Sequence, residues 1–314
     1  MSDATVTISF AGPHVSIQDA GRPGLMRYGV PASGPMDRTS FALANAALGN
    51  PPGHPGIEVS LGGLTLHCAG AAVTVAIAGG GFIAEIGGRR LGSWCVLTLH
   101  PGESLTLRPG PWGSWCYLAI AGDLRAESWL GSRATHGSSG FGGGRLTSGQ
   151  RLTIAAPKLL PQREGPIACP VWARPRHLLR CTLGPQDRFF STETLARFTE
   201  SRFETTTAFD RMGMRLAGPM IAPENALSIP SEPILRGAVQ VSGDGVATVL
   251  LSDHQTTGGY PKIATVLGCD LEAFVQCRPR DAVMFQAVTP AEAIAITRQN
   301  AQRLAAFTDR LRGV

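Results

Sequence analysis

The sequence predicts a mainly β protein made of two similar units, with few and short helices. Apolar runs rich in Val, Ile, Leu and Thr recur along the 314-residue chain, and each has the length of a strand. The 39 Gly and 23 Pro separate these runs, as the tight turns of a strand-rich protein require. Short words of the first half also recur in order in the second half, which predicts an internal duplication.

The expected strands have an apolar, β-branched pattern. They lie at residues 5–10, 64–67, 71–78, 94–99, 104–108, 115–120, 151–155, 178–183, 238–242, 246–252 and 281–288. A helix is expected at 38–48 with Asp37 as its N-cap, and a second at 192–200. The last helix is expected to begin at the capping box formed by Thr289 and Glu292.

The duplication is indicated by four pairs of words at a nearly constant spacing. The pairs are 33–36 with 217–220, 58–60 with 240–242, 91–94 with 271–274, and 100–101 with 278–279. Prolines cluster between 157 and 175, which places a boundary there. The predicted units are residues 1–165 and residues 166–314, the second carrying the C-terminal helix.

Composition excludes several classes of protein. A chain with 43% hydrophobic and 16% charged residues can bury a core and is not expected to be disordered. The net charge of +5 comes from dispersed arginines rather than a basic run, so nucleic-acid binding is not expected. Seven isolated cysteines indicate reduced thiols. With neither a signal peptide nor a transmembrane run in the sequence, we expect a cytoplasmic protein without a membrane partner.

The most varied functional groups lie in residues 252–262, Ser-Asp-His-Gln-Thr-Thr-Gly-Gly-Tyr-Pro-Lys, directly after an apolar run. A polar, Gly-hinged loop at the end of a buried strand is where scaffolds place binding groups, although a solvated hairpin is the alternative. The expected catalytic residues of this loop are Asp253, His254 and Lys262, and the expected substrate-binding residues are Gln255, Thr256, Thr257 and Tyr260.

Four residues outside this loop are further candidates. Glu58 lies between two apolar residues, so it is either a buried catalytic acid or base or, by strand alternation, a solvent-facing side chain. Asp19 and Arg22 either orient a substrate carboxylate or form a salt bridge that locks their loop. Arg211 lies in an Asp-Arg turn with the same two interpretations. No His or Cys spacing of a metal site occurs, so no metal is expected.

Three blocks of the sequence resemble the signature of a known family. Residues 16–50, residues 210–216 and residues 255–264, which contain Gln-Thr-Thr-Gly-Gly-Tyr-Pro-Lys-Ile-Ala, are similar to the allophanate hydrolase subunit 2 family. This family is also called KipA or the C subunit of 5-oxoprolinase, and it resembles the biotin-dependent carboxyltransferase domain of urea carboxylase. The resemblance implies two cyclophilin-like β-barrel units in one chain.

The resemblance also implies a function. It points to one component of an ATP-dependent 5-oxoprolinase, which opens 5-oxoproline to glutamate together with a KipI-type B subunit plus a LamB/YcsF-type A subunit. ATP would be the co-substrate of the complex, without a metal or covalent biotin on this chain. In that reaction Lys262 and Arg211 would stabilise phosphate or carboxylate charge, and Asp253 or His254 would transfer protons.

Two other functions remain open from the sequence. The chain could be a carboxyltransferase module that moves CO₂ from carboxybiotin, carried by a partner, to urea or a related amide. Alternatively, it could be a non-catalytic protein that binds a KipI-type regulator. A carboxyltransferase module would turn over its substrate, whereas a non-catalytic protein would bind the KipI-type regulator tightly without turnover.

Overall fold

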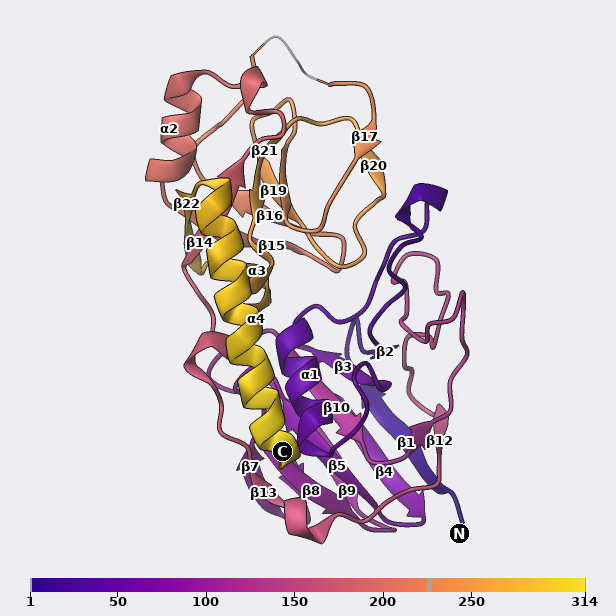
Figure 1. Cartoon of the computed structure of the whole chain (residues 1–314). Coiled ribbons are helices and arrows are strands. Elements are labelled where there is room, and N and C mark those ends of the chain that lie inside the picture. Colours follow the sequence, from indigo (N-terminus) through magenta and orange to yellow (C-terminus); the bar gives the residue numbers. More distant parts are fainter. Residues whose placement is uncertain (1, 225–227, 314) are drawn as a thin grey trace. The chain divides into compact units, whose positions relative to one another are not determined.

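The structure is a computed structural model that describes residues 2–224 and 228–313. It is mainly β, as predicted, and it divides into two compact units. The first unit comprises Met1–Arg22, Ser33–Arg174 and Leu304–Val314, and the second comprises Pro23–Ala32 and Pro175–Arg303. Figure 1 shows the elements of each unit, which are described separately below.

The first unit is built from two antiparallel sheets and one helix. The seven-stranded sheet has the order β11 (Asp123–Leu124), β12 (Arg151–Ala155), β1 (Ala4–Ala11), β4 (Leu64–Gly70), β9 (Ser104–Arg108), β6 (Ile83–Ile86) and β7 (Arg89–Gly92). The six-stranded sheet has the order β13 (Gly165–Pro166), β8 (Cys95–Leu99), β5 (Val73–Ala78), β10 (Trp115–Ile120), β3 (Gly56–Ser60) and β2 (Ser16–Gln18). Helix α1 (Arg38–Ala47) packs on β10 and β5.

The burial of each strand in the first unit follows from what covers it. Strands β1 and β4 alternate between buried and partly exposed residues, because one of their faces meets the core and the other meets solvent. Strands β3, β5 and β10 are buried along their whole length. The near-continuous apolar runs of β5 and β10 are the pattern of strands covered on both faces, and α1 supplies the second cover for these two strands.

Helix α1 has the termini that the sequence predicts. The Asp37 carboxylate accepts a hydrogen bond from the Ser40 N–H at 2.9 Å, which satisfies one of the free donors of the first turn. At the other end, the Arg163 guanidinium donates to the Ala47 carbonyl at 3.2 Å. The same guanidinium donates to the carbonyls of Leu311 and Arg312, so one side chain caps two helix ends.

The second unit contains a closed barrel. Around the barrel the strands are β14 (Leu178–Leu183), β21 (Lys262–Val266), β18 (Ala238–Val241), β19 (Ala247–Leu250), β16 (Gly213–Ala217), β15 (Phe203–Phe209) and β22 (Ala282–Ala287). Closure comes from the parallel pairing of β14 with β22. A small sheet pairs β17 (Glu232–Pro233) with β20 (Thr257–Gly258).

The helices that begin in the second unit are α2 (Thr192–Glu200), α3 (Gly268–Phe274) and α4 (Pro290–Arg312). Phe198 of α2 stacks on Phe285 of β22 with ring centroids 4.4 Å apart, and this pair anchors α2 on the barrel. Thr289 and Glu292 form the predicted capping box, with hydrogen bonds of 2.8 Å and 3.3 Å. The short 3₁₀ helices are η1 (Met26–Tyr28), η2 (Pro161–Arg163), η3 (Val171–Ala173) and η4 (Asp187–Phe189).

Each compact unit is made of more than one segment of the chain, whereas the proline cluster suggests a single boundary. The expected boundary lies at 165/166, whereas the compact units divide between Arg174 and Pro175. Residues 23–32 are also assigned to the second unit and residues 304–314 to the first. A boundary drawn on the sequence treats each unit as one continuous segment, and long-range packing need not respect that continuity. The internal duplication stays a prediction.

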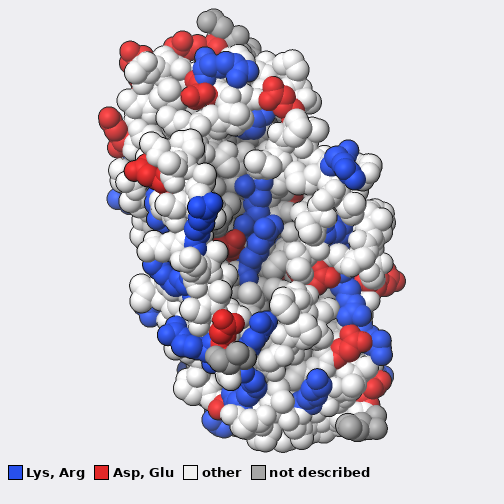
Figure 2. Space-filling view, viewed as in Figure 1, with Lys and Arg blue, Asp and Glu red and all other residues white. Residues whose placement is uncertain are grey.

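No helix in the described part of the chain is long and apolar enough to cross a membrane. Basic and acidic residues lie interspersed among uncharged ones on the face shown in Figure 2.

Candidate functional site

The loop of residues 252–262 lies where the sequence predicts it, between strands β19 and β21 of the second unit. Asp253 at its start is 1% exposed. Both of its oxygens are held by Arg211, with Nε–Oδ2 at 2.8 Å and Nη2–Oδ1 at 2.9 Å. The backbone repeats the connection, because the Asp253 N–H donates to the Arg211 carbonyl at 2.8 Å. The second unit therefore brings together two residues that the sequence proposed separately.

Lys262, at the other end of the loop, is the first residue of β21 and is only 2% exposed. Its ammonium lies 3.9 Å from a carboxylate oxygen of Glu232, and no residue in the described ranges forms a hydrogen bond with Nζ. Burial lowers the pKa of Lys262, and the Glu232 charge opposes that shift only in part. A buried ammonium without hydrogen bonds is costly for a fold, and such groups are enriched at functional sites.

Gln186 fixes both Lys262 and its acidic neighbour. Its side-chain oxygen accepts from the Lys262 N–H at 2.9 Å, and its amide nitrogen donates to the Glu232 carboxylate. Gln186 is itself 1% exposed. Gln186 thus helps to set the position of the Glu232 carboxylate near the ammonium, although the Glu232 side chain is about half exposed.

A pocket of about 550 Å³ opens beside this loop, entirely within the second unit. Gln255 and Tyr260 of the predicted set line it, together with Gln240 of β18. The side-chain Nε2 of Gln255 donates to the side-chain Oε1 of Gln240 at 3.3 Å. The amide nitrogen of Gln240 is buried and has no hydrogen-bond partner in the described structure. The pocket therefore contains a buried donor that is available to a bound acceptor.

The remaining loop residues shape the backbone. His254 is buried, and its Nδ1 lies 2.6 Å from the Gln255 carbonyl. The Thr256 carbonyl accepts from the Ile234 N–H at 3.0 Å, and Thr257 is exposed in β20. The Thr256–Ile234 hydrogen bond and the pairing of β20 with β17 hold the loop against the segment that contains β17.

Gly258 occupies a site with no room for a side chain. A Cβ at this position would lie 2.5 Å from Cδ1 of Ile234 and 2.7 Å from Nε2 of Gln240. The absence of a side chain at Gly258 therefore lets Ile234 and Gln240 pack directly against the loop backbone. The loop is tight, and the solvated hairpin is not what the structure shows.

Glu58 belongs to the first unit, on β3, and is completely buried. The alternative in which it points to solvent is wrong. Its Oε2 accepts hydrogen bonds from the Met36 N–H at 2.7 Å and from the Tyr117 hydroxyl at 3.0 Å. The Tyr117 oxygen in turn accepts from the Asp37 N–H at 2.6 Å. Burial, followed by the charges of Glu58 and Asp37, raises the pKa of Tyr117 well above its ordinary value, so this hydroxyl stays a donor.

Asp19 and Arg22, also in the first unit, both contact the segment around residue 132. The Asp19 carboxylate accepts from the Ser132 hydroxyl at 2.6 Å and from the Arg133 N–H at 2.6 Å. The Arg22 guanidinium donates to the Ala134 carbonyl and lies 4.9 Å from the Trp129 ring centroid. These contacts favour the loop-locking role, but through residues distant in sequence rather than through one another.

Sequence reasoning missed four residues that complete these sites. Gln186, Glu232 and Gln240 surround the loop in the second unit, and Tyr117 contacts Glu58 in the first. Each lies far from its partner along the chain, so no local motif signals it. No cluster of three or more potential metal ligands occurs in the ranges that the structure describes.

Comparison with known proteins places these sites in a family. Residues 28–287 match the family described as "Carboxyltransferase domain, subdomain A and B". The chain is 30% identical over 296 residues to the C subunit of 5-oxoprolinase from Escherichia coli K12, and the match covers 93% of this chain and 94% of that protein. It is 29% identical over 309 residues to urea amidolyase of Saccharomyces cerevisiae, covering 89% of this chain but 16% of that protein.

A solved structure has the same fold. The crystal structure of TTHA0988 superposes with a TM-score of 0.81 at 32% identity, over 90% of this chain. The present chain spans about half of that protein, 55% of its length. The match to residues 28–287 shows that the protein belongs to the family of carboxyltransferase domains with subdomains A and B, and the chain is also similar to relatives named as the C subunit of 5-oxoprolinase.

Proposed function

We propose that this chain is the C-type subunit of a cytosolic, ATP-dependent 5-oxoprolinase. It would act with a KipI-type B subunit plus a LamB/YcsF-type A subunit. The similarity to a relative named as the C subunit of 5-oxoprolinase, over nearly the full length of both chains, supports this assignment. The word "subunit" in that name supports an enzyme made of several different chains.

The proposed reaction overcomes the poor electrophilicity of an amide carbonyl. The lactam oxygen of 5-oxoproline attacks the γ-phosphorus of ATP and ADP leaves. Water then adds to the activated carbon, and the C–N bond breaks as the nitrogen takes up a proton. A second water releases phosphate, which leaves glutamate. Negative charge develops on oxygen in these steps, so a fixed cation or donor near that oxygen would lower the barrier.

The environment of the Lys262 ammonium is the observation that supports the proposal most strongly. Its ammonium is buried, lacks a hydrogen bond within the described residues and lies near a single carboxylate at 3.9 Å. An anionic oxygen from substrate would supply the missing acceptor. Such a contact would be worth more in this low-dielectric position than in water. Lys262 would therefore stabilise the negative charge on the oxygens of the transferred phosphoryl group.

The pocket beside the loop suits the rest of the substrate. The free amide nitrogen of Gln240 and the side chains of Gln255 and Tyr260 offer hydrogen bonds to a carboxylate or lactam group. Arg211 occupies both oxygens of Asp253, so this geometry favours a positioning role for Asp253. His254 then remains the proton-transfer candidate in the loop.

Glu58 would hold the chain that leads into α1 in place and would take no part in the reaction. Its carboxylate holds the Met36 N–H, immediately before the N-cap of α1, and shares Tyr117 with Asp37. A carboxylate with two donors inside a closed core supports the chain entering α1.

The test is ATP-dependent glutamate release from 5-oxoproline by the full mixture of the three proteins. Lys262→Met keeps most of the side-chain volume and removes the charge, and Lys158→Met changes the only other lysine, which is exposed. We expect Lys262→Met to lower kcat/KM by roughly 10²–10³-fold, as loss of one charge-stabilising donor does. Lys158→Met should retain activity. If a mixture that assembles releases no glutamate with the unmodified chain, the proposal fails.

A second candidate is carboxyl transfer from carboxybiotin on a partner to urea or a related amide. The family description and the similarity to urea amidolyase favour it. The same purified chain, mixed with a free carboxybiotin donor and urea, discriminates the two. Transfer of labelled CO₂ to urea without glutamate release in the first assay would establish this alternative instead.

A further inference from the structure

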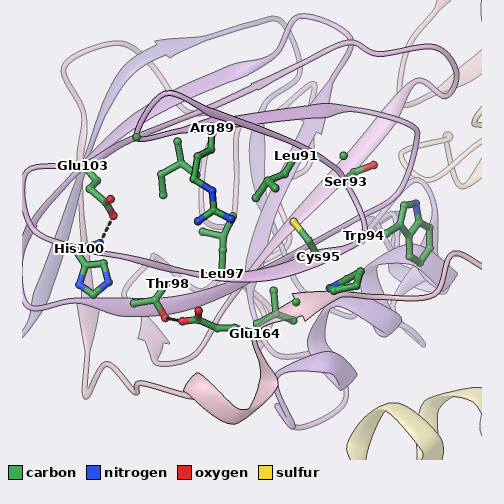
Figure 3. A pocket seen from close by; sticks show the side chains of 16 residues that line it. Arg89, Leu91, Ser93, Trp94, Cys95, Leu97, Thr98, His100, Glu103 and Glu164 are labelled. Carbon is green, nitrogen blue, oxygen red and sulfur yellow. Dashed lines mark hydrogen bonds between the residues drawn. The ribbon is translucent and has the colours of Figure 1, made fainter.

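A groove of about 770 Å³ in the first unit is not used by the proposed function (Figure 3). It lies between β7, the last strand of the seven-stranded sheet, and β8 near the edge of the six-stranded sheet. We call it the β7–β8 groove. Most of its lining comes from Arg89, Leu91 and Gly92 of β7, from residues 93–98 and from residues 164–166.

Both walls of the groove carry strand edges. Strand β7 pairs with β6 and ends the order of its sheet. Strand β13 pairs with β8 only at Cys95 and Val96. Along Leu97–Leu99, β8 therefore has β5 as its one strand neighbour in the described structure. Such edges present backbone N–H and C=O groups that can bond to an additional strand.

The floor of the groove is formed in part by slightly exposed apolar side chains. The three most exposed members of the buried apolar cluster of the first unit are Ile86 at 8%, Cys95 at 7% and Leu97 at 7%, and all three line this groove. Most other members of that cluster are at most 2% exposed. The apolar cluster therefore reaches the groove between the two free edges, where an added strand would cover these side chains.

The groove also contains the positively charged side chain of Arg89. Figure 3 shows Arg89 extending across the groove toward Leu97. Within the described ranges, the Arg89 guanidinium forms no hydrogen bond or ion pair. Its neighbours Arg90 and Arg108 both pair with Glu85, at 2.7 Å and 2.5 Å.

The carboxylates of the groove are engaged within the chain. Glu103 accepts from the His100 N–H at 2.8 Å, and Glu164 accepts from the Thr98 hydroxyl at 2.5 Å. An acidic group on an incoming chain would therefore find Arg89 as its partner.

We propose that the β7–β8 groove is the docking site for an extended segment of another protein, which adds a strand along β7. The segment carries an Asp or Glu beside Arg89 and β-branched residues over Ile86 and Leu97. Main-chain hydrogen bonds supply affinity, and the acidic side chain supplies specificity. This inference does not depend on the proposed reaction.

Random heptapeptides displayed on phage provide the probe, with the full-length chain as bait. We expect enriched peptides to contain one acidic residue among β-branched ones. Their synthetic forms should bind Arg89→Glu at least about tenfold more weakly than the unmodified chain. Arg90→Glu is the matched control, since Arg90 is also exposed but pairs with Glu85, and binding should change less than about twofold.

Two further measurements distinguish strand addition from other binding. N-methylation of alternate peptide residues should abolish binding, and hydrogen exchange should slow at 89–92 in the complex. Peptides that bind Arg89→Glu equally, or tolerate every N-methyl group, would overturn the proposal. Displacement of the peptide by free glutamate, with the same dependence on Arg89, would instead identify a small-carboxylate site and would also overturn it.

Discussion

The Arg211 guanidinium holds both carboxylate oxygens of Asp253 inside the second unit, at 2.8 Å and 2.9 Å, and both side chains are almost fully buried. This bidentate pair joins the turn before β16 to the start of the candidate loop. A buried pair of this kind is costly to break, because removing one partner leaves an uncompensated charge. The pair therefore fixes the start of the candidate loop at Asp253, and the other candidate residues of the loop follow Asp253 in the chain.

Replacing Asp253 by Asn should destabilise the protein by about 3–5 kcal/mol, since the Arg211 charge would stay buried without its counterion. Urea unfolding at pH 7 measures the change. Asp244→Asn is the control in the same unit, because Asp244 pairs with Arg215 on the surface, where both side chains are about half exposed. Solvent screens that pair, so its loss should hardly alter the unfolding free energy. Equal effects of the two substitutions would contradict the structural role of the buried pair.

Lys262→Met should stabilise the folded chain near neutral pH, although it lowers the proposed activity. The folded state lowers the pKa of Lys262 below its ordinary 10.5, so it disfavours the charged form. Between the folded pKa and 10.5 the unfolded chain binds more protons, and the stability of the unmodified protein rises with pH. The advantage of the variant should therefore shrink as pH increases through this window. Unfolding curves of both proteins at several pH values test this.

The opposite order of stability would show that Glu232 more than offsets the cost of burying the Lys262 charge. A direct measurement is available because the chain has two lysines. Lysine labelled with ¹³C at Cε should give two signals, and Lys262→Met assigns them. The Lys262 signal should titrate at a pH below 10.5, the ordinary pKa of a lysine side chain.

Tyr117→Phe should destabilise the first unit by about 1–3 kcal/mol, because it removes the hydroxyl between Glu58 and the Asp37 N–H. The buried carboxylate would lose one of its donors. Thermal and urea unfolding measure the loss. Tyr28→Phe, at a tyrosine that is 67% exposed, should have little effect. A variant of Tyr117 as stable as the Tyr28 variant would remove the argument for a supporting hydrogen-bond network around Glu58.

Gly258→Ala should impair the candidate loop, since its Cβ would lie within 2.7 Å of both Ile234 and Gln240. One of the two neighbours must shift, and Gln240 lines the pocket. We expect lower glutamate release by the three-protein mixture and faster proteolysis within 252–262. Gly268→Ala, in α3, is the control because its Cβ would meet nothing within 4 Å, and alanine favours a helix. Unchanged activity in Gly258→Ala would argue against a role for this tight packing.

The strands that the sequence predicted well are those with dense apolar runs. Residues 104–108, 115–120 and 178–183 form strands with the expected bounds, because burial on one or two faces leaves a visible pattern. Strand β15 is not among the expected strands, since its sequence Phe-Glu-Thr-Thr-Thr-Ala-Phe is largely polar. It is a strand because its neighbours β16 and β22 supply the hydrogen bonds, which is tertiary context overriding a weak local signal.

The sequence by itself determined the mainly β class, the capping of α1 and α4, and the position of the polar loop at 252–262. These features depend on neighbouring residues, and local propensity and apolar periodicity record them directly. Only the tertiary structure decided which side chains surround Lys262, that Glu58 is buried, and that Arg211 belongs to Asp253. Those contacts join residues far apart in the chain, and they exist because closing a barrel or stacking two sheets brings distant strands into register. The burial that changes the pKa of Lys262 is likewise a property of the packed core.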